Sequence, residues 1–376
     1  MNILIAMDSF KGSLTSRQAG EAVRSGLSNS NEITADVISV SDGGEGSLDA
    51  IYDMIGGVKT NVVVQDAFHK EMSVCCLLVE TEGKRVVYIE SARVIGLHNH
   101  KVDTKTVEIV SSYGLGQLLD YFVKMEMDEI VVFLGGTITT DGGLGILQAL
   151  GVDIYDKYHK VLPTKQNPLL DYAFLDEKQL AGVKKRLKNT NIKIACDVHN
   201  TYCGKHGAAY IFAGQKGASI QQIKILDEKL ERFDEQHPEI NLQNTKGSGA
   251  AGGIAGMLVL LGGKLCHGFD VINNVINISS YVEKADLVFT GEGSIDHQSD
   301  GGKLPQRMAE LANSCGVPIV ALCGKRESEL PSLEGMFSGV FAIQMGPVTM
   351  DEAIRETSKN LTVTTQNIMH LLRSFI

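Results

Sequence analysis

The chain has 376 residues, of which 43% are hydrophobic and 21% are charged, and this length and composition predict a globular protein of two or three domains. The net charge is -10 and no basic patch is visible, so we expect no nucleic-acid partner. No apolar stretch reaches the roughly 18 residues that span a bilayer. With no signal peptide and no disulfide framework visible, we expect a cytoplasmic protein with no membrane partner.

The first predicted elements alternate between strands and helices. Residues 3–6 form a buried strand, and a polar loop then leads to a helix whose N-cap Thr15 has its capping-box partner at Gln18. A second strand, at about residues 33–40, is followed by a glycine-rich turn and a helix that runs through residues 48–55. This alternation is typical of a parallel sheet with right-handed crossovers.

The middle of the chain differs from both ends. Its predicted elements are, in order, several β-runs at 60–90, a helix at 104–123, a strand at 129–134, a helix at 144–150, an irregular lysine-rich segment at 152–190, a strand at 192–196 and a helix at 221–233. The C-terminal part returns to the alternation, with strands at 286–290, 318–323 and 340–343 and helices at 304–315 and 352–372.

The shared pattern of the two ends predicts an α/β fold with two domains. Residues 1–88 and 282–376 form a Rossmann-like or flavodoxin-like domain with a mainly parallel sheet, and residues 89–281 form an inserted, mixed α/β domain. The pattern alone leaves a second arrangement open, in which two domains follow each other along the chain.

Three Asp-Gly-Gly triplets, at 42–44, 141–143 and 300–302, form the first candidate site. The first two follow predicted strands and precede predicted helices, and ligands of open α/β sheets bind at that carboxyl edge. Glycines there expose backbone N–H groups that suit an anion such as phosphate. A single triplet would more often be a helix cap, but three together favour binding. The residues assigned to binding here are Gly43, Gly44, Glu45, Asp141, Gly142 and Gly143.

A second candidate site follows the first predicted strand of the C-terminal part. Gly291 and Gly293 flank the carboxylate of Glu292, and Asp296 lies four residues beyond Glu292. Two carboxylates at this spacing predict a magnesium site, because Mg²⁺ prefers oxygen ligands and keeps several waters. Lys303 follows near a predicted helix start, from which it could reach a phosphate. The alternative is a polar turn without function.

Two further loops carry candidate residues. Asp8, Ser9 and Lys11 lie together after the first predicted strand, where a lysine among small polar residues suits a phosphate or a carboxylate. Taken alone, Lys11 would more often be a surface lysine. Asp197 comes directly after the predicted strand that ends at residue 196, again at a carboxyl edge.

Two other patterns match known motifs but lack their context. Gly247, Gly249 and Gly252 have the spacing of a dinucleotide fingerprint, yet no strand precedes them, which argues against NAD. The cysteines and histidines between 196 and 206 could be zinc ligands, but they crowd into eleven residues and begin inside a strand. The chain has no Walker-type G-x-x-x-x-G-K-[ST] loop and no G-x-S-x-G elbow.

Taken together, these loops resemble those of the type I glycerate kinase family. The matching segments occur in the family's order over nearly the whole chain, which makes the set specific although each segment is short. They are 8–13, 41–46, 135–151, 195–198, 215–218, 249–253 and 290–293, with Asp296 and Lys303.

This resemblance implies ATP-dependent phosphorylation of D-glycerate with magnesium, in the cleft between the two α/β domains. The product would be 2-phosphoglycerate or 3-phosphoglycerate. The partners are then glycerate and ATP, and homo-oligomer formation is left open. The chain departs from the family at Met7, where proline is usual, and at 91–97, where Arg93 stands in a stretch normally rich in alanine. We expect Arg93 to alter how the substrate carboxylate is held.

Phosphoryl transfer depends mainly on positioning and charge neutralisation. We therefore assign the role of proton acceptor to Asp42, with Asp8 and Asp197 as the alternatives. Lys11 and Lys303 would neutralise the charge of the phosphoryl group or of the glycerate carboxylate. Glu292 and Asp296 would hold magnesium, directly or through water. The remaining predicted binding residues are Ser9, Gly291, Gly293 and Arg93.

Three other functions remain open from the sequence. One is a kinase for a related small hydroxy acid or sugar acid. Another is a catalytically inactive homologue that senses a nucleotide or phosphate, against which the presence of Asp42, Glu292 and Lys303 argues. The third is a dehydrogenase, against which the misplaced dinucleotide motif argues.

Overall fold

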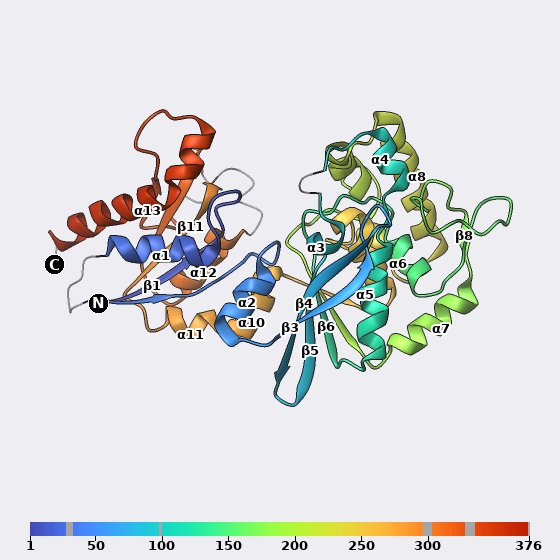
Figure 1. The fold of residues 1–376 in the computed structure, drawn as a ribbon, viewed down its shortest axis with the longest axis horizontal. Coiled ribbons are helices and arrows are strands. Elements are labelled where there is room, and N and C mark those ends of the chain that lie inside the picture. The colour runs from blue at the N-terminus through green and yellow to red at the C-terminus, as the bar shows by residue number, and fades with distance from the viewer. Residues whose placement is uncertain (28–32, 98–99, 296–302, 328–334, 375–376) are drawn as a thin grey trace. The chain divides into compact units, whose positions relative to one another are not determined.

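The computed structural model describes residues 1–27, 33–97, 100–295, 303–327 and 335–374 (Figure 1). The chain divides into two compact units. The terminal unit comprises Met1–Asp42, Asp49–Gly56 and Gly268–Ile376, and the central unit comprises Gly43–Leu48 and Gly57–His267. The predicted domain limits, after residues 88 and 281, stay a prediction.

The terminal unit contains a fully parallel sheet of five strands. The strands are β1 (Asn2–Met7), β2 (Thr34–Val37), β11 (Leu287–Ile295), β12 (Ile319–Arg326) and β13 (Gly339–Ala342), in the order β13-β12-β11-β1-β2. This is the flavodoxin-like order, in which the chain builds outwards in both directions from the β1–β11 pair. Ligands of such sheets bind at the carboxyl ends of the strands at this switch point.

Helices cover this sheet. Figure 1 shows α1 (Ser16–Gly26) and α13 (Met350–Arg373) side by side, and both contribute to one buried cluster with Ile3 and Ile5 of β1. Successive strand residues point to opposite faces, so the alternate side chains of β1 point away from this cluster. α12 (Leu304–Ser314) packs against β11 and β12.

The central unit contains a mixed sheet of six strands in the order β10-β9-β6-β5-β4-β3. The strands are β3 (Val58–Gln65), β4 (Glu71–Thr81), β5 (Lys84–Glu90), β6 (Glu129–Phe133), β9 (Asn191–Ala195) and β10 (Lys264–Cys266), and β7 (Ile154–Tyr155) pairs separately with β8 (Phe174–Leu175). β3, β4 and β5 pair antiparallel, whereas β5, β6, β9 and β10 pair parallel. The predicted α/β fold, with one parallel and one mixed sheet, is confirmed.

The other helices surround these sheets or connect their strands. They are α2 (Ser47–Ile55), α3 (Ala92–Ile95), α4 (Thr104–Ile109), α5 (Tyr113–Lys124), α6 (Leu144–Ala149), α7 (Glu177–Leu187), α8 (Ile220–Gln236), α9 (Ile254–Leu260), α10 (Gly268–Ile276) and α11 (Ile278–Val282).

Two segments of the central unit differ from the sequence prediction. The predicted helix at 104–123 is divided into α4 and α5, because the backbone N–H of Ser112 turns away to donate to the Asp141 carboxylate at 2.7 Å. The segment at 152–190, predicted to be irregular, contains α7. That helix begins where the Asp176 side chain accepts the N–H of Gln179 at 2.9 Å.

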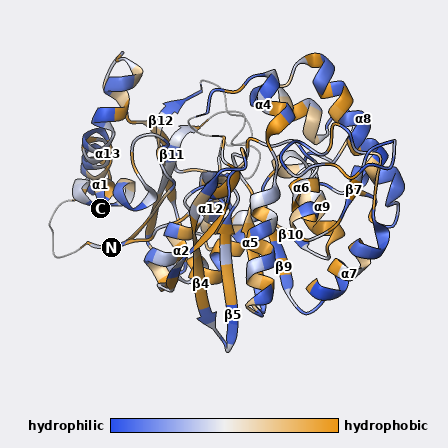
Figure 2. Cartoon of the chain, turned by 45° about the vertical axis from the view of Figure 1, so that its right-hand side comes forward, coloured by the Kyte–Doolittle hydropathy of each residue, from blue (hydrophilic) through white to orange (hydrophobic). Residues whose placement is uncertain are grey.

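The hydrophobic core of the central unit lies between its sheet and its helices. Phe122 and Ile130 are both fully buried within it. Figure 2 shows hydrophobic residues concentrated along β4 and β5. Within the described part of the chain, no helix combines the length and the hydrophobicity that crossing a membrane requires.

Candidate active site

The carboxyl ends of β1 and β11 meet at the switch point of the terminal sheet. Met7 pairs with Gly291, and the Asp8 N–H donates to the Gly291 carbonyl at 2.8 Å. Asp8 is only 7% exposed. The Ser9 N–H donates to Oδ1 of Asp8 at 2.7 Å, whereas Lys11 is exposed. The predicted loop thus carries a buried carboxylate at its start and a lysine at its surface.

Residues 291–293 do not form the predicted glycine loop. Instead β11 continues through them to Ile295, and Gly291 pairs with Leu322 of β12. A Cβ at Gly291 would lie 1.9 Å from the Leu322 carbonyl oxygen, so only glycine allows this close approach. Glycine at position 291 therefore allows β11 and β12 to pair closely. Glu292 lies within β11 and is 8% exposed.

Asp8, Asp42 and Glu292 form an acidic cluster at this edge, in which the charges of Asp42 and Glu292 act on the Asp8 carboxyl. Burial raises the pKa of Asp8 well above its ordinary value, and the negative charges of Asp42 and Glu292 raise it further. The N–H of Ser9 and the charge of Lys11 act in the opposite direction and lower this pKa. The charges of Asp42 and Glu292 disfavour ionisation of Asp8, and a bound cation would offset this effect.

The chemistry of this cluster fits magnesium. Mg²⁺ takes oxygen ligands, uses one or two carboxylates and keeps several waters. Glu292 supplies a carboxylate, and Lys303 Nζ lies 3.7 Å from its Oε2, at the N-cap position of α12. Asp296, the second predicted ligand, lies outside the described residues. Within the described ranges, no three His, Cys, Asp or Glu side chains form a group that could hold a metal ion. Waters and a substrate phosphate would therefore complete the shell.

A second set of predicted residues lies at the carboxyl edge of the central sheet. The turn at 43–45 packs against the end of β6, since a Cβ at Gly135 would lie 3.5 Å from the Gly44 Cα. Gly43 has a φ of +93°, a left-handed conformation that favours glycine. The Ser47 hydroxyl donates to the Gly44 carbonyl at 2.7 Å and closes the turn where α2 begins.

Arg93 forms an ion pair with Glu90, with 2.6 Å between Nε and Oε2. Glu90 ends β5 and is 2% exposed, and its other carboxylate oxygen accepts the Leu48 N–H at 2.8 Å. Glu90 thus links Arg93 to the first turn of α2. The sequence analysis missed Glu90 because its partner lies 42 positions away and no local motif marks it.

The second triplet forms a tight turn around the carboxylate of Asp141, which is fully buried. Oδ2 accepts the N–H and the hydroxyl of Ser112 at 2.7 and 2.8 Å, and Oδ1 accepts the Gly143 N–H at 3.0 Å. The Gly142 N–H donates to the Gly252 carbonyl at 3.0 Å. These two glycine amides therefore donate within the protein, and the carboxylate holds the turn together.

Replacing Asp141 by alanine should destabilise the fold by about 3 kcal/mol, because several buried donors lose a charged acceptor at once. As a control, replacing Asp103, an exposed helix cap that accepts the Thr106 N–H at 2.9 Å, should cost only about 1 kcal/mol. Urea unfolding of both variants measures the difference. Equal losses would contradict the central role of Asp141 in this turn.

Asp197 follows β9 and faces a histidine. Its Oδ1 lies 3.4 Å from Nδ1 of His267, which follows the neighbouring strand β10. The Cys196 N–H donates to the Cys266 carbonyl at 3.0 Å and joins the two strand ends. The sequence analysis missed His267 because β10 has only three residues and was not predicted.

The structure thus places the predicted residues in two groups. The terminal unit holds Asp8, Ser9, Lys11, Asp42, Gly291, Glu292, Gly293 and Lys303. The central unit holds Gly43, Gly44, Glu45, Arg93, Asp141, Gly142, Gly143 and Asp197. Lys216, which lies in a matching segment of the family but received no role from the sequence, is buried in the central unit.

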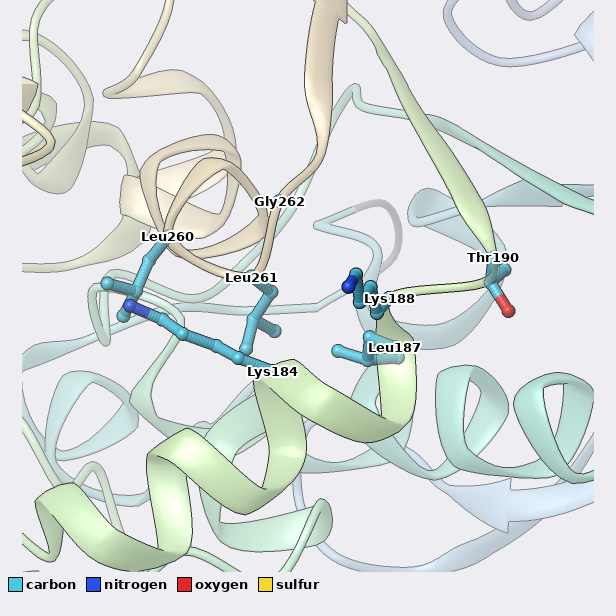
Figure 3. A pocket seen from close by; sticks show the side chains of 7 residues that line it. All are labelled: Lys184, Leu187, Lys188, Thr190, Leu260, Leu261 and Gly262. Carbon is cyan, nitrogen blue, oxygen red and sulfur yellow. The ribbon is translucent and has the colours of Figure 1, made fainter.

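A cavity of about 280 Å³ lies in the central unit, at the ends of α7 and α9 (Figure 3). Its lining residues are Lys184, Leu187, Lys188, Thr190, Leu260, Leu261 and Gly262. Thr190 comes just before β9 and Gly262 shortly before β10, so the cavity lies at the amino edge of the central sheet. It contains none of the predicted site residues.

Comparison with known proteins agrees with this fold. The model of the glycerate kinase family matches residues 3–373. A glycerate kinase of Bacillus cereus is 32% identical over 374 residues, covering 98% of this chain and 97% of that protein. A glycerate 2-kinase of Escherichia coli is 30% identical, covering 98% and 97%. The crystal structure of a putative glycerate kinase 2 from Salmonella typhimurium matches with a TM-score of 0.81 and 28% identity, covering 100% of this chain and 98% of that one.

The flavodoxin-like sheet, its acidic switch point and these full-length matches define an α/β enzyme of the small-molecule kinase class. The chain belongs to the glycerate kinase family. The prediction of a glycerate kinase enzyme is confirmed at this level, whereas the type I subdivision stays a prediction.

Proposed function

We propose that this protein transfers the γ-phosphoryl group of ATP to a hydroxyl of D-glycerate, with Mg²⁺ as the cofactor. The observation that carries the proposal is the cluster of Asp8, Asp42 and Glu292 at the β1–β11 switch point, in a chain of the glycerate kinase family. A site that receives both an anionic nucleotide and its cation needs carboxylates for the metal and lysines for the phosphates.

The residues of the terminal unit divide into three roles. Asp42 is the first candidate for accepting the hydroxyl proton, because it is half-buried whereas Asp8 is buried. Lys11 and Lys303 would offset phosphate charge, and Ser9 would contact the phosphate from the same loop. Glu292, together with Asp296, would hold the metal, which supplies charge neutralisation to the phosphates when bound.

The residues of the central unit would shape the binding edge of its sheet. The 43–45 turn would contact phosphate, and Arg93, already paired with Glu90 at 2.6 Å, would orient the carboxylate of glycerate. Asp141, Gly142 and Gly143 would contribute through the fixed form of their turn, since the two glycine N–H groups donate within the protein. Asp197, held by His267, is the alternative proton acceptor.

We propose the 2-hydroxyl as the acceptor. The support is the printed name of the Escherichia coli relative, a glycerate 2-kinase that is 30% identical over nearly the full length. Arg93 stands where the family usually has a stretch rich in alanine, and this difference would change which substrate is bound rather than which reaction occurs. A related small hydroxy acid or sugar acid is therefore the second candidate substrate.

The test is ADP release from ATP and Mg²⁺ with D-glycerate as acceptor and L-glycerate as control, followed by phosphorus NMR of the product. We expect stereoselective turnover and 2-phosphoglycerate. A 3-phosphoglycerate product would contradict the choice of hydroxyl alone. Folded protein that binds ATP without turning over D-glycerate would contradict the substrate, and the same assay with other hydroxy acids would then identify the second candidate. Binding of nucleotide with no turnover of any acid would indicate an inactive homologue.

A further inference from the structure

Lys216 is a buried lysine whose side chain holds a segment of another element. It is 4% exposed and lies in the short turn between residues 213 and 217. Its Nζ donates to the Thr139 carbonyl at 2.6 Å and to the Thr137 hydroxyl at 3.4 Å. Lysine is almost never fully buried unless it is paired, so this position calls for a specific reason.

The segment that Lys216 holds leads directly from β6 to the predicted binding elements of the central unit. On its N-terminal side, Gly135 lies against the 43–45 turn. On its C-terminal side, the Asp141 turn follows. The segment is also packed tightly, because a Cβ at Gly252 would lie 2.1 Å from the Thr139 carbonyl oxygen. A small displacement of this carbonyl would therefore move both predicted binding turns.

The hydroxyls of Thr139 and its neighbour Thr140 do not anchor the segment by hydrogen bonds to the described residues. Among the described residues, the Thr139 and Thr140 hydroxyls are buried and find no hydrogen-bond partner. Such groups are rare in native structures and leave the segment dependent on other contacts. The backbone carbonyl of Thr139 instead receives the lysine ammonium, and charge-assisted hydrogen bonds of this kind are the strong ones.

We propose that Lys216 is a positioning residue for phosphoryl transfer, whose ammonium fixes the 137–139 segment and thereby sets both the 43–45 turn and the Asp141 turn. The proposal rests on the proposed function of these turns as parts of the ligand site. Lys216 acts through the segment and not by touching a substrate. Remote positioning of this kind can affect the catalytic rate strongly, since a misplacement of about 1 Å can lower the rate by roughly 100-fold.

The electrostatic surroundings of Lys216 agree with this role. Burial lowers the pKa of Lys216 to about 7, and the negative charge of Asp141 acts in the opposite direction. The backbone of Asp103 packs against Gly217, and the Asp103 carboxylate accepts a hydrogen bond from the Thr106 N–H. A lysine with a lowered pKa loses its proton as the pH rises through that value. The charged hydrogen bond, and with it the activity, should therefore decline above about pH 7.

The variants that test this are Lys216→Met and Lys216→Arg, with Lys229→Met as the matched control. Lys229 also donates to a backbone carbonyl, that of Tyr172 at 2.7 Å, and burial also lowers its pKa. Unlike Lys216, within the described residues it does not contact a segment that leads to a predicted binding turn. We expect kcat/KM of Lys216→Met to fall by about 100-fold, mainly in kcat, and that of Lys229→Met to change by less than about threefold. Lys216→Arg should retain part of the activity and lose the decline above pH 7, because arginine stays protonated.

A second measurement keeps the proposal testable without glycerate turnover. Hydrogen–deuterium exchange of residues 135–143 should be faster in Lys216→Met than in wild type and unchanged in Lys229→Met. If Lys216→Met fails to fold, the exchange and pH profile of Lys216→Arg decide. Equal activities of the two methionine variants, or a pH decline that persists in Lys216→Arg, would overturn the proposal. If wild type proves inactive on glycerate while the exchange difference is observed, the proposed function fails and the positioning of the segment stands.

Discussion

Replacing Asp42 by asparagine should lower the kcat of glycerate phosphorylation by about two to four orders of magnitude, the range that a positioned general base contributes. Asparagine keeps the shape of the side chain but cannot accept the hydroxyl proton. The KM for ATP should change little, because the lysines and the turns of the proposed site remain. Steady-state kinetics at saturating ATP and Mg²⁺ measure the effect.

The stability of the Asp42→Asn variant separates a chemical role from a structural one. The charge of Asp42 raises the pKa of the buried Asp8, so its removal relieves repulsion and should not destabilise the fold. Asp36→Asn is the matched control, since Asp36 is an exposed aspartate on β2 of the same unit. Near-normal turnover in Asp42→Asn would reject this residue and move the test to Asp8 and Asp197.

Replacing Asp8 by asparagine should have opposite effects on activity and on stability. Activity should fall by about 100-fold or more, because Asp8 is an alternative proton acceptor and interacts electrostatically with Asp42 at the switch point. Stability should rise at neutral pH. Asparagine resembles the protonated form of the buried carboxyl, and its Oδ1 can still accept the Ser9 N–H.

The sign of the pH dependence follows from the raised pKa of Asp8 in the folded protein. Below the ordinary aspartate pKa the carboxyl is protonated in both states, so wild type and variant should be equally stable. As the pH rises from that value through the raised pKa, only the folded state keeps the proton, and wild type loses stability that the variant retains. Urea unfolding at pH 5 and pH 8, with magnesium removed by a chelator, should show a growing difference. A difference that shrinks with pH would contradict the prediction.

Elements with local signals could be predicted from the sequence alone. The capping box of Thr15 and Gln18 predicted the start of α1, where both hydrogen bonds are present at 3.2 and 3.0 Å. The alternation of buried strands and amphipathic helices predicted a parallel sheet. The spacing of apolar residues that distinguishes strands from helices can be recognised within a window of about ten to twenty residues. The ordered loops were enough to indicate the family, since each keeps its own short motif.

Features that depend on distant partners became visible only in the folded chain. Residues 291–293 continue a strand because β12 pairs with them, and the predicted helix at 104–123 divides because Asp141 draws the Ser112 N–H away. The roles of Glu90 and Lys216 were not predicted for the same reason, since their hydrogen-bond partners lie 42 and 77 positions away. The pKa of Asp8 likewise follows from burial and from charges brought together by the β1–β11 register. Local propensity cannot encode such contacts, because they exist only once the sheet has formed.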